Sequence, residues 1–134
     1  MPGETSAPLN LGNMLHARAA ENPQKVALFC GLEAMSYRAL DEYSARLAQW
    51  FLGQSLRPGD RVAIHWSNSF EVVQIYFALF KAGMIAVAVN VRLKSAEIGY
   101  ILEHSGARMC FSEPALASRA KEAGAVCPIL TELP

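Results

Sequence analysis

The N-terminal third of the chain alternates helical and strand-like spacing of apolar residues. Apolar residues recur at helical spacing after Asn10, a good N-cap, until Pro23 prevents continuation, which predicts a helix from Asn10 to Asn22. A second stripe predicts a helix capped by Ser36 and ended by Gly53. Between the two helices, short apolar runs flank a turn-like segment, which predicts a small antiparallel hairpin near residues 26–37.

The rest of the chain alternates short apolar runs with helical stripes. In order, the pattern predicts a strand over 61–66, a helix over 70–82, a strand over 84–89, a helix over 95–106, a strand over 108–111, a helix over 113–123 and a strand over 126–130. This order predicts an α/β fold with a mostly parallel, doubly wound sheet and helices on both faces, because crossovers between parallel strands are right-handed.

The helix over 70–82 and the strand over 84–89 are the most apolar part of the pattern. The helix is apolar on nearly every side, so it must be covered on more than one face. The strand is a continuous apolar run, typical of a parallel strand buried on both sides, and we expect it at the centre of the fold. Residues 10–134 are predicted to form a single α/β domain, and residues 1–9 a flexible lead-in.

Charge and composition narrow the functional classes. Lysine plus arginine number 12 and aspartate plus glutamate number 12, so there is no basic excess to hold nucleic acid. The apolar stretch over 70–91 contains Glu71 and Lys81, which disfavours a membrane span. The first ten residues lack a secretory pattern. These features predict a cytoplasmic protein that neither binds nucleic acid nor spans a membrane.

The three cysteines support the same interpretation. Cys30, Cys110 and Cys127 form an odd set without a C-x-x-C pair, and each lies within or beside an apolar run. We expect small buried side chains in a reducing compartment rather than disulfides or metal ligands.

Candidate chemistry lies where two adjacent strands are predicted to end, since ligands of open α/β sheets bind beyond the carboxyl ends of strands. His65 and Trp66 end one strand, and Asn90 and Arg92 follow the next. His65 would carry protons or contact substrate, or would bond to backbone as a structural residue. Arg92 would clamp a phosphate or carboxylate, or tie its loop to a carboxylate or carbonyl. These four residues are the substrate-binding candidates.

Several common catalytic motifs are missing from the sequence. Neither G-x-x-x-x-G-K-[ST] nor G-x-G-x-x-G occurs, so both familiar phosphate cradles are absent. G-x-S-x-G, H-E-x-x-H and acids or histidines at metal-ligand spacing are absent as well. We therefore assign no catalytic residue and no metal site.

A series of segments nevertheless resembles the opening of the adenylate-forming (AMP-binding) superfamily, and within it the acyl-CoA synthetases that act on fatty or aryl acids. In that family the corresponding patterns include T-Y-x-E-L-D, G-x-x-x-G-D-R-V-A, N-S-x-E and Y-I-L-x-D-S-x-A. The segments here are 35–41 (MSYRALD), 56–64 (LRPGDRVAI), 68–71 (NSFE), 78–83 (ALFKAG), 89–93 (VNVRL) and 100–107 (YILEHSGA).

The resemblance implies a parent enzyme that activates a carboxylic acid with Mg-ATP to an acyl adenylate and transfers the acyl group to CoA. The resemblance also implies that the family's phosphate loop, magnesium-binding glutamate and catalytic lysine would lie beyond Pro134. We expect the chain alone to be inactive, to bind no cofactor, to pair with the remainder of the parent and to self-associate through exposed apolar surface. The alternative is a free-standing, non-catalytic Rossmann-like binding or interaction module.

Overall fold

The computed structural model describes residues 9–124 and 126–134. Most of the predicted lead-in over 1–9 lies outside these residues, and the single-domain assignment of 10–134 stays a prediction. The elements in chain order are α1 (Leu11–Glu21), β1 (Val26–Cys30), β2 (Glu33–Ser36), α2 (Tyr37–Gly53), β3 (Arg61–His65), α3 (Phe70–Ala82), β4 (Ile85–Ala88), α4 (Ser95–Ser105), β5 (Met109–Ser112), α5 (Ala117–Glu122) and β6 (Ile129–Leu130).

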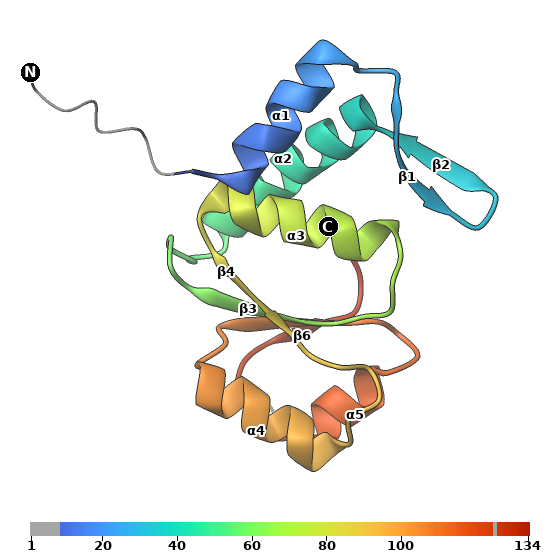
Figure 1. Ribbon diagram of the computed structural model, residues 1–134. Helices are drawn as coiled ribbons and strands as arrows, with labels where there is room; N and C mark the ends of the chain where they lie inside the picture. Colours follow the sequence, from blue (N-terminus) through green and yellow to red (C-terminus); the bar gives the residue numbers. More distant parts are fainter. Residues whose placement is uncertain (1–8, 125) are drawn as a thin grey trace, which may run out of the picture.

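The fold is a parallel sheet with helices on both faces, as predicted. The four strands lie in the order β4-β3-β5-β6, and every pair of neighbours is parallel. Helices α1, α2 and α3 lie on one side of this sheet, and α4 and α5 lie on the other (Figure 1). The predicted hairpin is confirmed: β1 and β2 form a separate antiparallel pair that projects from the side of the molecule.

Helix α3 follows its predicted bounds because both of its ends carry strong local signals. The Ser69 hydroxyl accepts a hydrogen bond from the Val72 amide at 3.4 Å, which caps the first turn. Gly83 ends the helix in the left-handed conformation at φ 72°, where glycine avoids the Cβ penalty. The side of α3 that contains Ile75 and Leu79 is fully buried toward the sheet.

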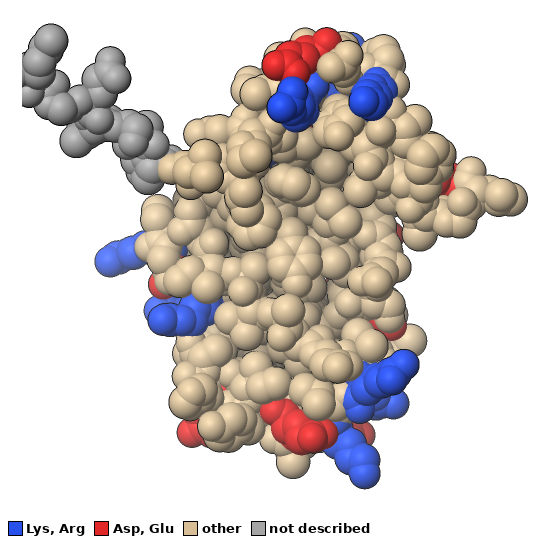
Figure 2. All heavy atoms as spheres, in the orientation of Figure 1, with Lys and Arg blue, Asp and Glu red and all other residues tan. Residues whose placement is uncertain are grey.

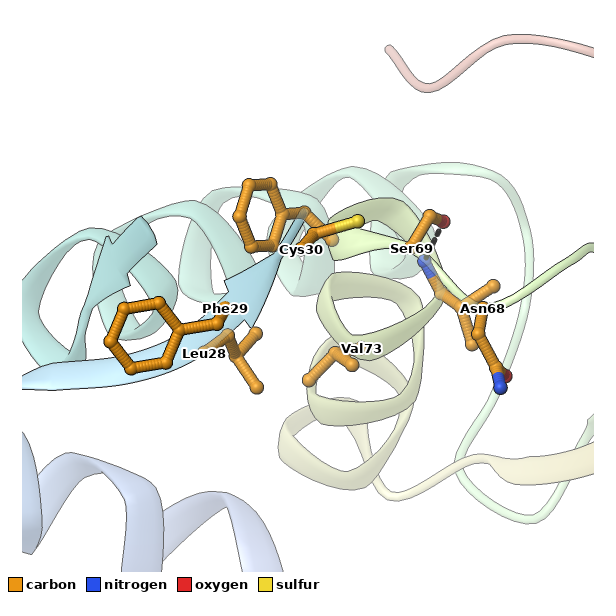
Figure 3. Close-up of a pocket in the computed structure, with 8 residues that line it drawn as sticks. Leu28, Phe29, Cys30, Asn68, Ser69 and Val73 are labelled. Carbon is orange, nitrogen blue, oxygen red and sulfur yellow. Dashed lines mark hydrogen bonds between the residues drawn. The ribbon is translucent and has the colours of Figure 1, made fainter. Parts of the chain in front are cut away.

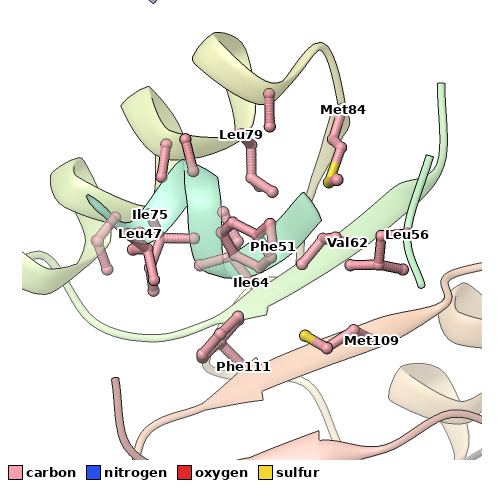
Figure 4. Close-up of a cluster of buried hydrophobic side chains, with 14 residues drawn as sticks. Leu47, Phe51, Leu56, Val62, Ile64, Ile75, Leu79, Met84, Met109 and Phe111 are labelled. Atoms are coloured by element: carbon pink, nitrogen blue, oxygen red, sulfur yellow. The ribbon is translucent and has the colours of Figure 1, made fainter. Parts of the chain in front are cut away.

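Large side chains fill the space between the sheet and helices α2 and α3. Phe51 and Phe111 meet edge to face with ring centroids 5.7 Å apart, and both are fully buried. Figure 4 shows this cluster, which comprises Leu47, Ala48, Phe51, Leu56, Val62, Ile64, Val72, Ile75, Ala78, Leu79, Ala82, Met84, Met109 and Phe111.

The core on the other face of the sheet is built from smaller side chains. Ala63 on β3 and Cys110 on β5 are fully buried against α4 and α5. The whole cluster comprises Ala63, Val89, Ile98, Leu102, Ala107, Cys110 and Ala120.

A polar contact ties the three helices of the first layer together. The Lys81 ammonium on α3 donates to the Asp41 carboxylate on α2 at 2.5 Å and to the Asp41 carbonyl at 2.8 Å. His16 Nδ1 on α1 lies 2.9 Å from the same carboxylate. Burial raises the pKa of Asp41, but the hydrogen bonds and charges of Lys81 and His16 outweigh it, so the pKa is lowered overall.

Strand β4 departs from the prediction that it is central and buried on both sides. It pairs only with β3 in the described sheet, and Ile85 is 46% exposed. The strands buried along their length are β3, apart from Arg61, and β5. An apolar run indicates that a strand is buried, but it does not indicate whether the strand lies at the centre or at the edge of the sheet. Its position depends on strand order, which is set by contacts between residues distant in sequence.

The cysteine prediction is only partly confirmed. All three residues are free thiols, and Cys110 is buried, where burial, followed by the neighbouring Cys127, raises its pKa to about 12. Cys127 is half-buried, and burial raises its pKa too. Cys30 is exposed, contrary to the prediction, because it ends a hairpin strand that stands away from the core.

The last two elements are shorter than predicted. Helix α5 was expected over 113–123 but begins at Ala117. The Glu113 amide donates to the His65 carbonyl at 3.0 Å, so this residue is still tied to the end of the sheet, and residues 114–116 form a turn before the helix. Strand β6 was expected over 126–130 but contains only Ile129 and Leu130.

Candidate functional site

The strand order places a topological switch point between β3 and β5. The chain passes from β3 to β4 on one side and then returns to β5 on the other side of β3. Connections therefore leave these two central strands in opposite directions, and this opens a crevice at their carboxyl ends. The predicted site residues lie around this end of the sheet.

His65 is buried at the end of β3 and is not open to a ligand. Its side chain is fully buried, and Nδ1 lies 2.8 Å from the Ser112 hydroxyl on β5, so its partner is a side chain rather than the expected backbone group. Among the described residues, Nε2 is the one buried side-chain polar atom without a hydrogen-bond partner. Burial lowers the pKa of His65, the Arg119 charge lowers it further and Glu113 raises it. The imidazole is therefore held neutral beneath the surface.

A second pair of contacts joins the loops after β3 and β5. The Glu113 carboxylate accepts hydrogen bonds from the Ser67 amide at 2.7 Å and from the Ser67 hydroxyl at 3.0 Å. Together with the pair formed by His65 and Ser112, these bonds fix the geometry of the switch point. Sequence reasoning missed Ser112 and Glu113, although they follow a predicted strand at its carboxyl end, the same signal that identified His65 and Asn90.

Trp66 and Asn90 come together on the α3 side of the sheet. They line an open cavity of about 570 Å³ with Asn68, Tyr76 and other residues that follow β3 and β4. The Asn90 side-chain oxygen accepts from the Arg92 amide at 2.9 Å, which shapes the loop after β4. The cavity offers an indole, two amides and a phenol, a set that can bind an uncharged or amide-bearing group.

Arg92 lies in a different hollow on the opposite face of the sheet. This hollow, of about 320 Å³, is lined by Arg92, Lys94, Ser95 and Arg119. The Arg119 guanidinium donates to the Val91 carbonyl at 3.2 Å, which holds it beside the loop. Three cations around one hollow favour an anionic group such as a phosphate or carboxylate.

The structure thus separates the four predicted residues. Trp66 and Asn90 share one cavity, Arg92 lines another, and His65 is enclosed between the two central strands. Over residues 9–124 and 126–134, no group of three potential metal ligands comes together and no helix is long and apolar enough to cross a membrane.

Comparison with known proteins shows the family. Residues 15–133 match the family described as AMP-binding enzyme. The chain belongs to the AMP-binding enzyme family. The predicted resemblance to the N-terminal part of the adenylate-forming enzymes is thereby confirmed, and relatives named as CoA ligases support it.

The relatives match most of this chain, but the match covers only a small part of each relative's own length. Triostin synthetase I from Streptomyces triostinicus is 37% identical over 97 residues, which is 72% of this chain and 18% of the relative. A medium/long-chain-fatty-acid–CoA/3-oxocholest-4-en-26-oate–CoA ligase from Mycobacterium marinum is 33% identical over the same length and the same shares. The chain spans about a fifth of such members of the AMP-binding family.

Solved structures of the AMP-binding family show the same fold. A benzoate CoA ligase from Burkholderia xenovorans LB400 superposes with a TM-score of 0.88 at 22% identity, over 92% of this chain and 26% of the ligase. The N-terminal subdomain of Klebsiella oxytoca NpsA superposes with a TM-score of 0.81 at 28% identity, over 91% of this chain and 31% of that subdomain. The arrangement of sheet and helices is therefore that of the N-terminal part of these enzymes.

Proposed function

We propose that this chain is the N-terminal framework of an ATP-dependent ligase that activates a carboxylic acid as an acyl adenylate and transfers it to CoA. The observation that carries the proposal is the family match over 15–133 together with relatives named as CoA ligases. The parent would use ATP, Mg²⁺ and CoA. The remainder of that parent enzyme is the proposed partner of this chain.

The geometry supports a framework role rather than a complete active site. The titratable side chains at the switch point are already engaged, since His65 is enclosed and bonded to Ser112, and the Glu113 carboxylate is bonded to Ser67. The two open hollows offer amides and aromatic groups on one side of the sheet and cations on the other, and among the described residues neither is lined by a histidine, a cysteine or a carboxylate. We expect the 134-residue chain to have no ligase activity of its own.

We propose that the hollows contribute substrate contacts within the parent. Trp66 and Asn90 would contact an uncharged part of a substrate, and Arg92 with Lys94 and Arg119 would hold a phosphate or carboxylate. His65 would position the two central strands through Ser112 rather than touch substrate. A cytoplasmic location is proposed from the three free thiols, and recovery of the protein from an oxidising compartment would contradict it.

The decisive experiment is acid-dependent exchange of pyrophosphate into ATP. The 134-residue chain should show none, whereas the longer gene product should show exchange and form an acyl-CoA. In that active enzyme, Arg92→Met should raise the KM of one anionic substrate about tenfold with kcat nearly unchanged, while Arg38→Met on the surface of α2 should leave both parameters unaltered.

Other results would overturn these proposals. Robust exchange by the isolated chain would show that it contains a reaction centre. An in-frame stop codon directly after Pro134 would favour the alternative of a free-standing, non-catalytic module. An unchanged KM for every substrate in Arg92→Met would remove Arg92 from the binding site.

A further inference from the structure

The hollow on the α4 side of the sheet is lined by cations from two separate segments of the chain. Arg92, Lys94 and Ser95 follow β4, and Arg119 comes from α5; this site is called the cation hollow below. Figure 2 shows lysine and arginine side chains close together over α5 and the start of α4. The groove between the hairpin and α3 differs, since the described residues that line it carry no charge (Figure 3). The cation hollow therefore favours an anion.

Arg119 connects the cation hollow to the end of β3. Its guanidinium donates to the Val91 carbonyl at 3.2 Å. Val91 follows Val89 by two residues, and the Val89 amide donates to the Ile64 carbonyl at 2.9 Å. Ile64 directly precedes His65, so the segment that Arg119 touches begins beside this histidine.

The side chain of His65 lies on the same face of the sheet as α5. Side chains alternate along a strand, and Ala63, two residues earlier, packs in the cluster that also contains Ala120 of α5. His65 is fully buried, and its Nε2 atom has no hydrogen-bond partner among the described residues. Because the Ser112 hydroxyl can donate or accept, its contact with Nδ1 is retained when the imidazole gains a proton.

Charged groups act on His65 from the elements around it. Burial lowers the pKa of His65 most, the Arg119 charge lowers it further, and the Glu113 carboxylate raises it. Burial raises the pKa of the Cys110 thiol, on the same face of β5, to about 12, so this group stays neutral. The buried residues of α4 are apolar. Of the groups named, only Arg119 also lines the cation hollow.

We propose that the cation hollow binds its anion together with a proton, and that His65 takes up this proton. The inference rests on the proposed function, in which the hollow holds a phosphate or a carboxylate. An anion beside Arg119 offsets the guanidinium charge that acts on His65, so the imidazole accepts a proton more readily. Such coupling is reciprocal, so a proton on His65 strengthens anion binding by the same factor. Binding of the anion therefore tightens as the pH falls.

The first test follows the imidazole signals of the 134-residue chain by NMR during an acid titration. Sulfate represents a phosphate group, acetate represents a carboxylate, and chloride at equal ionic strength is the reference. Sulfate or acetate should raise the pKa of His65 by about half a pH unit, and its affinity should increase up to about threefold as the pH falls. Binding is followed at the amides of residues 91–95. The signals of His16 and His104 should respond to acid alike in all three salts.

The two anions identify the chemistry of the ligand. A response of His65 to sulfate alone indicates a phosphate-type group, and a response to acetate alone indicates a carboxylate. Either result supports the proposal, because both anions would act through Arg119.

Variants separate the charge of Arg119 from its structural role. Arg119→Gln should raise the pKa of His65 in chloride, because it removes the guanidinium charge, and should largely abolish the response to sulfate. Arg119→Lys retains a positive charge and should keep most of both properties. The matched control is Lys121→Gln, which removes a charge from an exposed position of the same helix and should alter neither.

Two results would overturn the proposal. Sulfate or acetate would bind at residues 91–95 and leave the pKa of His65 as it is in chloride, or Arg119→Gln would leave that pKa unaltered. The unaltered chain decides the question even if Arg119→Gln fails to fold. If neither anion binds, this inference and the anion contact proposed for Arg92 are both wrong. An active ligase whose His65 ignores the anion contradicts only this inference, whereas an inactive longer gene product that shows the linkage contradicts only the proposed function.

Discussion

The two faces of the sheet differ in the size of the side chains that pack on them. Toward α2 and α3, large side chains such as Phe51 and Phe111 interlock, and the helices are tied by Asp41 and Lys81. Toward α4 and α5, small residues such as Ala63 fill the core, and the end of the sheet buries polar side chains. We therefore expect stability to be concentrated on the first face, whereas the polar groups that shape the switch point, His65 and Ser112, belong to the second.

The largest expected effect is on the first face. Phe111→Ala removes a fully buried ring from contact with Phe51, so we expect a loss of about 3–5 kcal/mol in the free energy of unfolding, measured by urea denaturation. Phe29→Ala, at a position that is 78% exposed, should change it by less than about 0.5 kcal/mol. A loss below about 1 kcal/mol for Phe111→Ala would show that the first face is not the stabilising one.

A smaller effect is expected from the polar tie on the same face. Asp41→Asn weakens charged hydrogen bonds in a largely buried place and should cost about 1–3 kcal/mol at pH 7. Since the pKa of Asp41 is lowered in the folded protein, its contribution is present above the ordinary aspartate value and is lost as the pH falls below about 4. Denaturation of both proteins at pH 7 and pH 3 should show their stabilities converging, and a constant difference would contradict this account.

The smallest effect is expected on the second face and depends on pH. The pKa of His65 is lowered, so the unfolded chain binds a proton more readily than the folded one, and stability falls as the pH drops below about 6.5. This slope is at most about 1.4 kcal/mol per pH unit. His65→Leu should flatten the dependence between pH 7 and pH 5. If His65→Leu keeps the slope of the unaltered chain, the pH dependence of stability comes from other titratable groups.

The sequence predicts the fold best where local signals are decisive. Ser69 and Gly83 bound α3 through capping and a left-handed residue, and both signals are read within a few positions. The order of strands and helices likewise follows from periodicity and the right-handed crossover. The position of β4 at an edge could not be predicted, because which strand lies beside which depends on contacts between distant parts of the chain.

In the candidate site too, local signals could be read from the sequence, whereas contacts between distant residues could not. The rule that ligands meet the carboxyl ends of strands identifies Trp66 and Asn90, which do line one cavity. It does not tell on which face of the sheet a loop residue lies, so Arg92 was grouped with residues on the other side. The burial of His65 depends on Ser112, which comes from a strand 47 positions further on.

The unprotected edge of β4 also bears on how such a protein is made. A ribosome adds roughly 5–20 residues per second, so several hundred residues take tens of seconds, far longer than a small α/β unit needs to fold. While a longer polypeptide of this kind is being made, the outward N–H and C=O groups of Ala86 and Ala88, which have no partner strand among the described residues, stay exposed. In that interval the strand is open to pairing with another nascent chain, and we expect chaperone binding to matter most then.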